Sequence, residues 1–316
     1  METNREAGKM TVARKRKQAG NAHTFGPKTN AVMVVILGLA AFMCIFPFLY
    51  VIVISFTAEE SLALNGYQLI PESWSVDAYT YLWNMRDQLL QSYGITIVVT
   101  VLGTIISVSM IALYSYAISR PQFRYRKFFT FFAFFTMLFG AGLVPLYIVV
   151  SQVLGLRNTI WALIIPLAMN AFYIIIMRTF FMRSVPESIL ESARIDGAGE
   201  WRIFFKIVAP LAVPGIATIS LFTTLGYWND WFNALLFIDN PDLVPLQSLL
   251  MRIENNMEFM RQNTQLGAAA HQIYSTIPQD AAKMAMVVIA TLPIAVSYPF
   301  FQKYFISGLT IGGVKE

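Results

Sequence analysis

Residues 88–119 read QLLQSYGITIVVTVLGTIISVSMIALYSYAIS, without one charged side chain. A helix needs about 20 mostly apolar residues to cross the hydrocarbon core of a bilayer, so this run is long enough for one crossing. Five further charge-free intervals are similarly apolar: 29–58, 128–156, 158–177, 207–229 and 284–302. A seventh interval, 262–279, contains four glutamines, Asn263 and His271. We therefore expect six crossings and leave the seventh interval outside the membrane.

The composition supports a membrane protein. Apolar residues make up 56% of the chain and charged residues 13%, against about 25% charged in soluble domains. Inside a bilayer only helices satisfy every backbone polar group within one segment, whereas a buried soluble core would require amphipathic helices. We predict an all-α integral membrane protein with helices over 31–54, 92–118, 128–151, 159–181, 211–234 and 284–303.

The lysines and arginines set the expected orientation. Eighteen of the twenty-three lie in the segment 1–30, between the second and third helices, between the fourth and fifth helices together with Arg178 at the end of the fourth, or at the C-terminus. Cytoplasmic loops carry such an excess, so we expect both termini to be cytoplasmic and the connections 55–91 and 238–282 to be external. The basic tail 1–30, expected to be disordered at its start, is interpreted as a membrane-proximal anchor rather than a nucleic-acid-binding segment or a cleaved signal.

A short polar segment, 183–210, separates the fourth and fifth apolar runs. Ser184 and Glu187 have the spacing of a capping box, and Gly197 stands where a helix ends in a left-handed residue. Residues 199–208 are predicted to form a second short helix with Trp201, Phe204, Phe205 and Val208 on one side. Taken alone, this pattern also fits an ordinary helical hairpin on the membrane surface.

The polar segment resembles a known family. Its sequence Glu191-Ser192-Ala193-Arg194-Ile195-Asp196-Gly197, followed by Ile207-Val208-Ala209-Pro210, is similar to the E-A-A-x₃-G-x₉-I-x-L-P loop of permease subunits in binding-protein-dependent ABC importers. It departs from that pattern at Ser192 and Ala209. The resemblance implies the type I importer permease fold and a coupling helix that docks on an ATPase subunit. It assigns that contact to Glu191, Ser192, Ala193, Asp196, Gly197 and Ala198.

The C-terminal part extends the resemblance. Residues 283–305 look like the small permease subunit of maltose-type importers, and closest to the branch for complex or uronic-acid-bearing oligosaccharides. The end of the chain is similar to the family's G-L-T-x-G-G-V-K-G, with Glu316 in place of the last glycine. The resemblance implies that Gly312, Gly313, Val314 and Lys315, in the cytoplasmic tail 307–316, enter the ATPase interface. It also implies that the region 250–275 reaches into the cleft of a binding protein.

Two groups of residues are candidates for the substrate path. Tyr227, Trp228, Asn229 and Asp230 combine aromatic rings with hydrogen-bonding groups near the outer end of the fifth apolar run, as stacking on sugars requires. An aromatic belt with a snorkelling acid is the alternative interpretation. Asn170 and Tyr173 in the fourth run are similar candidates, although an asparagine there also serves to bridge helices.

No enzyme motif stands out in the sequence. The single cysteine, Cys44, and two widely separated histidines form no metal or nucleophile site, and no phosphate-binding loop with its lysine is present. We therefore expect a non-catalytic chain without a bound cofactor or metal.

Together these features predict one permease subunit of an ATP-driven oligosaccharide importer in the bacterial cytoplasmic membrane, with its permease domain over 31–306. The resemblance implies a homologous second permease chain, two ATPase subunits that use ATP and Mg, and an extracytoplasmic solute-binding protein as partners. A secondary transporter or a membrane scaffold working without an ATPase is the alternative.

Overall fold

The computed structural model describes residues 26–262 and 277–312, and these residues are mostly helical. Two units are distinguished, 1–53 and 54–316. The longer helices are α2 (Pro27–Ser55), α5 (Arg86–Ser119), α6 (Arg126–Leu138), α9 (Ala171–Ser184), α13 (Val213–Trp228), α15 (Leu246–Gln262) and α17 (Gln279–Gly312). The described part contains no strand beyond an isolated bridge between Thr57 and Trp74. The expected all-α class is confirmed.

Short elements connect these helices. They are α3 (Glu59–Asn65), α4 (Asp77–Asn84), α7 (Leu143–Ile148), the π-helix η1 (Val149–Val153), α8 (Trp161–Ile164), η2 (Ile165–Leu167), α10 (Glu187–Ile195), α11 (Glu200–Ile203), the π-helix η3 (Phe204–Val208), α12 (Ala209–Leu211), α14 (Phe232–Phe237) and η4 (Pro241–Leu243).

Three helices are long and apolar enough to cross a membrane by themselves: Lys28–Ser55, Arg86–Ser119 and Gln279–Pro299. In place of the other three expected crossings the structure has three bent pairs of helices, the last of which begins at Glu200, before the expected crossing 211–234. The bends are 114° between Arg126–Leu138 and Leu143–Val153, 54° between Trp161–Leu167 and Ala171–Ser184, and 82° between Glu200–Leu211 and Val213–Trp228. Three to six spans therefore follow from length and composition.

The breaks have local causes that a count of apolar residues overlooks. Gly142 adopts a φ of 87° between α6 and α7, a conformation that suits glycine. The carboxamide of Asn170 accepts hydrogen bonds from the N–H groups of Phe172 and Tyr173 and so starts α9 anew. Pro214 occupies the first turn of α13, where a helix begins. The predicted single helices over 128–151, 159–181 and 211–234 are corrected accordingly, and α13 ends at Trp228.

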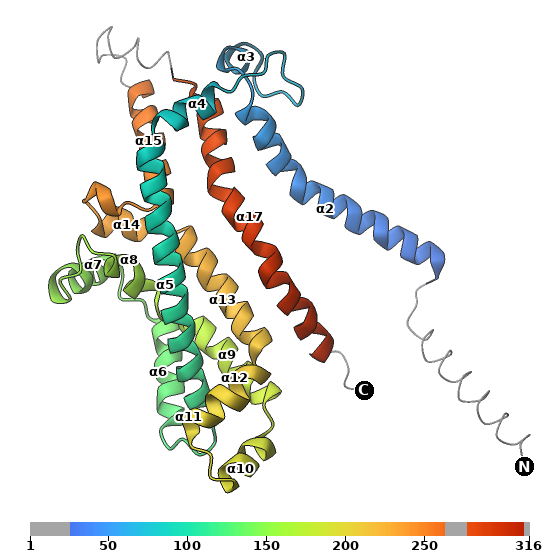
Figure 1. Cartoon of the computed structure of the whole chain (residues 1–316), viewed down its shortest axis with the longest axis vertical. Helices are drawn as coiled ribbons and strands as arrows, with labels where there is room; N and C mark the ends of the chain where they lie inside the picture. Colours follow the sequence, from blue (N-terminus) through green and yellow to red (C-terminus); the bar gives the residue numbers. More distant parts are fainter. Residues whose placement is uncertain (1–25, 263–276, 313–316) are drawn as a thin grey trace, which may run out of the picture. The chain divides into compact units, whose positions relative to one another are not determined.

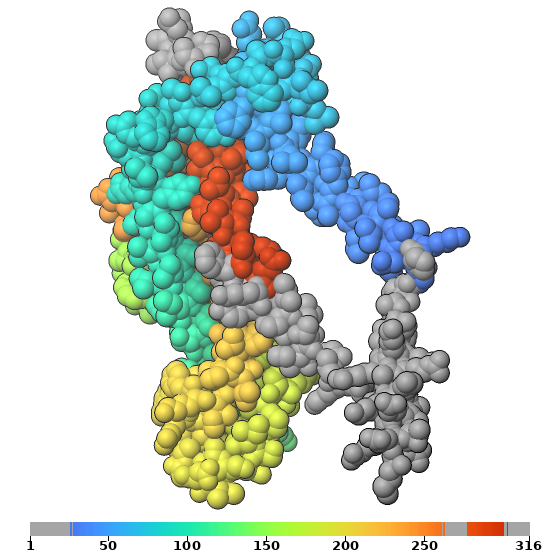
Figure 2. Space-filling view, turned by 45° about the vertical axis from the view of Figure 1, so that its right-hand side comes forward, coloured from blue at the N-terminus to red at the C-terminus, as the bar shows by residue number. Residues whose placement is uncertain are grey.

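Within the unit 54–316, helix α5 packs against both α9 and α13 (Figure 1). The crossing with α13 is close: a Cβ added to Gly103 would lie 2.6 Å from the ring of Tyr227. Helix α17 lies against α13 and α15. A buried hydrophobic cluster joins α5 and α9 to the segment α10–α13 and includes Ile111, Phe181, Leu190, Ile203 and Val208. Figure 2 shows the segment from α10 to α12, in yellow, gathered at one end of the unit.

Candidate functional site

The sequence predicted the end of helix α10 correctly but not its start. At its end, Gly197 has a φ of 78°, its N–H donates to the carbonyl of Arg194 at 3.0 Å, and the N–H of Ala198 donates to that of Ala193 at 2.9 Å. This is a Schellman motif, and the predicted left-handed glycine is confirmed. At its start the predicted capping box is wrong: Ser184 ends α9, and Pro186 is the N-cap with no side-chain bond.

Glu187 fails to cap α10 because its carboxylate is bound elsewhere. It accepts from Nη1 of Arg120 at 3.2 Å, from Nε2 of Gln122 at 2.7 Å and from Nη1 of Arg194 at 3.3 Å. Arg120 follows the last residue of α5, and only 7% of its side chain is exposed. The carboxylate therefore ties the first turn of α10 to the end of α5.

A second carboxylate extends this contact. Glu200, at the start of α11, accepts from Nε of Arg194 at 2.9 Å and from the hydroxyl of Tyr116 at 2.8 Å. The hydrogen bond with Glu200 raises the pKa of Arg194. Arg120 also lies over the Tyr116 ring, 5.2 Å from its centroid. Four charged groups thus form one network, which we call the α10 clamp: Arg120, Glu187, Arg194 and Glu200.

The outer face of α10 is free of this clamp. Glu191 is exposed and, among the described residues, has no ion pair or side-chain hydrogen bond. Ile195, one turn later, is 86% exposed. Ser192 is exposed and donates to the carbonyl of Ser188 at 3.0 Å. The helix therefore presents a carboxylate beside a large apolar side chain.

The remaining residues of the predicted ATPase contact have other positions. Ala193 is buried in the cluster that joins α5 and α9 to the segment α10–α13, and Ala198 is half-buried against it. Asp196 and Gly197 are exposed in the turn that ends the helix. The sequence pattern thus mixes residues that face the solvent with residues that hold α10 in place. It also omitted Ile195, although an isoleucine on the polar side of an amphipathic helix was the signal that could have revealed it.

The second short helix is confirmed in outline and corrected in its orientation. Residues 200–208 are helical, as α11 and η3. Ile203, Phe204 and Val208 are buried, whereas Trp201 and Phe205 are 67% and 61% exposed and stack on each other. Phe204 and Val208 thus lie on the buried side and Trp201 and Phe205 on the exposed side, so the four expected residues do not share one side.

The structure gives Tyr227 and Trp228 partners inside the bundle. The Tyr227 hydroxyl donates to the carbonyl of Ile164 at 2.9 Å and accepts from Ser107 at 2.9 Å. The indole N–H of Trp228 donates to the carbonyl of Ala290 at 3.1 Å. Both side chains are buried, so a sugar would reach them only if the rings left these contacts.

The other path candidates are more accessible. Asn229 is exposed, and its amide donates to the carbonyl of Leu225 at 3.0 Å. Asp230 is half-buried and accepts two hydrogen bonds from Asn233, at 3.2 Å and 2.9 Å. Asn170 is exposed while it caps α9, and Tyr173 is half-buried and stacks on Phe222.

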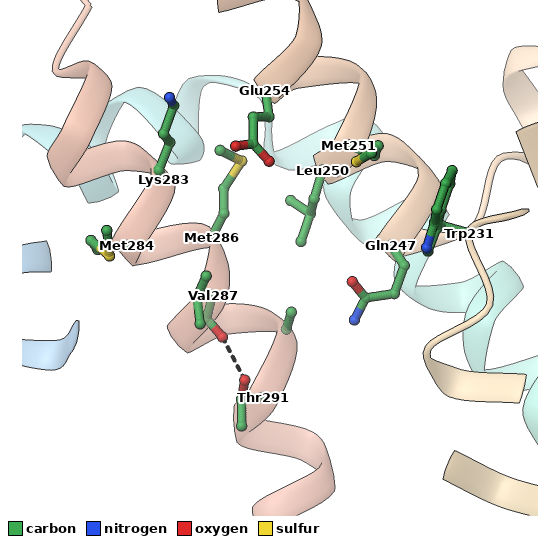
Figure 3. Close-up of a pocket in the computed structure, with 11 residues that line it drawn as sticks. Trp231, Gln247, Leu250, Met251, Glu254, Lys283, Met284, Met286, Val287 and Thr291 are labelled. Atoms are coloured by element: carbon green, nitrogen blue, oxygen red, sulfur yellow. Dashed lines mark hydrogen bonds between the residues drawn. The ribbon is translucent and has the colours of Figure 1, made fainter. Parts of the chain in front are cut away.

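A cavity of about 370 Å³ opens between α15 and α17, beside Trp231 (Figure 3). Its lining is Trp231, Gln247, Leu250, Met251, Glu254, Lys283, Met284, Met286, Val287, Ala290 and Thr291. The side-chain amide of Gln247 donates to Oδ1 of the Asn229 side chain at 3.5 Å, which connects this α15–α17 cavity to one predicted path residue. Sequence reasoning did not single out Trp231 or the other lining residues as path residues, because the two walls belong to different helices and lack a motif.

The cavity combines an aromatic face, apolar side chains and a few hydrogen-bonding groups. Such a lining is typical of small-molecule sites of about 300–1,000 Å³. Glu254 and Lys283 carry its two charges, and neither has an ion-pair partner among the described residues. Trp231 is 38% exposed. The arrangement suits stacking against a sugar ring with hydrogen bonds to its substituents.

The C-terminal prediction lies mostly outside the described residues. Gly312 ends α17, whereas Gly313, Val314 and Lys315 lie outside the described residues. The basic tail up to residue 25 also lies outside them. Within the described ranges, no group of His, Cys, Asp and Glu is placed to hold a metal ion.

Comparisons with known proteins agree with this architecture. The profile of the binding-protein-dependent transport system inner membrane component family matches residues 111–311. The polygalacturonan/rhamnogalacturonan transport system permease protein YtcP of Bacillus subtilis is 40% identical over 87% of this chain and 94% of its own length. The arabinooligosaccharides transport system permease protein AraQ of Halalkalibacterium halodurans is 28% identical over 87% and 92%.

A solved structure is similar as well. A chain of a bacterial ABC transporter that imports the acidic polysaccharide alginate superposes with a TM-score of 0.73 at 30% identity. The similarity covers 89% of this chain and 99% of the solved one.

Proposed function

We propose separate roles for two parts of this chain, which belongs to the family of binding-protein-dependent transport system inner membrane components. The chain is a permease subunit of an ABC importer for sugars and is itself non-catalytic. In our proposal the clamped helix α10 passes the movement of an ATPase subunit to the bundle, and the α15–α17 cavity contacts the sugar. ATP and Mg are used by the partner ATPase subunits.

One observation carries the coupling proposal: α10 is fixed on its inner side and unpartnered on its outer side. The α10 clamp joins both ends of the helix to α5 and α11. Glu191 and Ile195 project from the opposite face. A helix held in this way moves together with α5, so a push on its outer face reaches the spanning helices. The predicted contacts Ser192, Asp196 and Gly197 border this outer face.

The proposed assembly and topology follow the family. This chain would pair with a homologous permease, two ATPase subunits and an extracytoplasmic binding protein. The three bent pairs each count as one crossing, which gives six spans with both termini cytoplasmic and Asp77 and Glu254 external. An impermeant thiol reagent applied to intact cells should label a cysteine at position 254 and not at position 194, in a Cys44→Ala background. The reverse pattern would overturn the orientation.

We further propose that the cargo is an oligosaccharide that carries uronic acids. Support comes from the relative named for polygalacturonan and rhamnogalacturonan, and from the solved structure named for alginate. In the α15–α17 cavity, Lys283 supplies the cation that would attract a carboxylate, and Trp231 supplies the stacking surface. Asn229 and Asp230 stay proposed path residues, and Asn170 and Tyr173 stay so further along the bundle.

Transport by the reconstituted complex tests the proposal. Galacturonan and neutral arabinan oligosaccharides of equal length are compared at limiting concentration, and uptake is normalised to assembled complex. Galacturonan should be preferred. Lys283→Gln should reduce that preference, and Trp231→Ala should reduce uptake of both sugars. Met284→Leu, a volume-conserving change in the same lining, is the control. Equal uptake of both sugars by the wild type would refute the acidic cargo.

The alternative of a membrane protein that acts without an ATPase makes a different prediction. The chain would then purify alone and transport with an ion gradient as its only energy source. Co-purification with an ATPase, lost in Glu191→Lys and retained in Asp77→Lys, would support the importer instead.

A further inference from the structure

A second cavity, of about 450 Å³, lies between α6 and α9. Its lining is Arg126, Lys127, Thr130, Phe131, Phe134, Ile175 and Arg178. On α6, Arg126, Thr130 and Phe134 follow one another at intervals of four, as do Lys127 and Phe131, so these side chains share one face. Helix α9 packs against that face and contributes Ile175 and Arg178, which are three residues apart. We call this space the α6–α9 cavity.

The cavity carries three positive charges and no acidic residue. The ion pairs of the described residues involve Arg86, Arg120, Arg157 and Arg194, and none of the three cations that line the cavity. The Nε of Arg178 donates to the carbonyl of Ile118 at 3.3 Å, which orients the guanidinium and leaves its two Nη groups for another acceptor. Because no acidic residue in the lining balances these three charges, the cavity is expected to attract an anion.

The start of α6 adds to this positive potential. Its first turn contains no acidic residue, and no side chain caps it. The helix N-terminus is itself the positive end of the helix dipole, so Arg126 and Lys127 repel it. A phosphate is a suitable anion here, because helix N-termini and arginine side chains both bind phosphate oxygens. Thr130 does not compete for this role, since its hydroxyl donates to the carbonyl of Arg126 at 2.7 Å.

The order of residues along α6 distinguishes a lipid from a soluble anion. The cations stand at its first turn, and Phe134 stands two turns further, about 12 Å along the axis. Phe131 and Phe134 are both exposed. Along α9, Ile175 comes before Arg178, which is the reverse of the order on α6. In the topology proposed above α6 and α9 belong to consecutive spans that run in opposite directions, so the charged residues of both helices lie at the same end of the cavity. A phosphodiester with two acyl chains has this same polarity.

We propose that the α6–α9 cavity binds an anionic phospholipid, with the phosphate between Arg126, Lys127 and Arg178 and an acyl chain along Phe131 and Phe134. Basic pockets between membrane-spanning helices are known to bind acidic lipid headgroups. The orientation proposed above places this lipid in the cytoplasmic leaflet, and that placement rests on the proposed function. The binding itself does not depend on transport.

Native mass spectrometry of the full chain tests the site. The purified protein is titrated with phosphatidylglycerol and, separately, with phosphatidylcholine of the same acyl composition. The wild type should retain phosphatidylglycerol preferentially. The triple variant Arg126→Gln, Lys127→Gln, Arg178→Gln should bind it roughly 100-fold more weakly, since each cation near a membrane surface contributes about fivefold. Lys127→Gln alone, at an exposed position, should weaken binding about fivefold.

A matched variant controls for charge. Arg124→Gln, Arg183→Gln and Lys206→Gln together remove three exposed cations that do not line the cavity, and this variant should bind like the wild type. Equal weakening in both triple variants would overturn the site in favour of general charge attraction. Displacement of the lipid by inorganic phosphate, or full phosphatidylglycerol binding by Phe131→Ser, Phe134→Ser, would overturn the lipid in favour of a soluble anion. If the wild-type protein binds phosphatidylglycerol but its complex does not transport oligosaccharides, only the proposed function is contradicted.

Discussion

Substitution of Glu187 by glutamine tests whether the α10 clamp holds the helix. Glu187 is 32% exposed and Arg120 is 7% exposed. Glutamine keeps the shape but removes the charge that the buried Arg120 requires. Removal of one partner from a buried ion pair costs about 3–5 kcal/mol. Water reaches the Glu187 carboxylate and offsets part of this loss, so we expect α10 to become less stable by about 2 kcal/mol.

Hydrogen exchange of the α10 amides measures this loss directly. A local opening that is easier by about 2 kcal/mol accelerates exchange about 30-fold. Glu191→Gln is the matched control: it is the same change on the same helix, at an exposed position without a partner, and exchange should stay as in the wild type. The double variant Arg120→Met, Glu187→Met should recover part of the protection, because a buried pair replaced by apolar residues leaves no isolated charge. Unchanged α10 protection in Glu187→Gln would refute the clamp.

Three further substitutions test the packing and docking described above. Ile195→Ser should weaken binding of the ATPase subunit roughly 10- to 100-fold in an affinity titration, since burial of one isoleucine contributes about 1.5–3 kcal/mol. Gly197→Leu should lower the same affinity because a left-handed residue with a Cβ costs about 1–2 kcal/mol, whereas Gly197→Asn, which tolerates this conformation, should lower it less. Gly103→Ala should destabilise the detergent-solubilised protein by about 1–3 kcal/mol in thermal unfolding, and Gly94→Ala, where a Cβ meets nothing within 4 Å, should not.

Local signals in the sequence predicted local structure well. Gly197 ends α10 as a left-handed residue because only four backbone groups within six residues are needed to form that turn. Glu187 illustrates the opposite case. Its spacing from Ser184 favours a capping box, but Arg120, 67 residues away, takes the carboxylate. A neutral hydroxyl or backbone N–H competes poorly with a buried guanidinium, and no local pattern reveals that guanidinium.

The apolar runs show a similar limit. Uniform hydrophobicity predicts where a chain enters the membrane environment, but it carries no information on where a helix bends. The positive φ of Gly142 and the carboxamide of Asn170 determine two of the breaks. Both residues were visible in the sequence, and Asn170 was interpreted as a path or bridging residue because a polar side chain within an apolar run also fits those roles. Its hydrogen bonds to the α9 backbone give it a capping role that does not preclude a second one.

The aromatic cluster 227–231 shows why the face of a helix matters more than composition. Tyr227 and Trp228 bury their rings and satisfy their polar atoms on backbone carbonyls, so they hold α13 against its neighbours. Trp231 lies beyond the helix end, where the chain turns, and its ring lines the α15–α17 cavity. Only two residues, Asn229 and Asp230, thus separate a packing tryptophan from an accessible one. Since replacement of a buried ring costs stability and replacement of an accessible ring costs contact with a ligand, Trp228→Ala should lower the thermal stability of the complex and Trp231→Ala should lower its normalised uptake. The reverse pattern would return the sugar contact to α13.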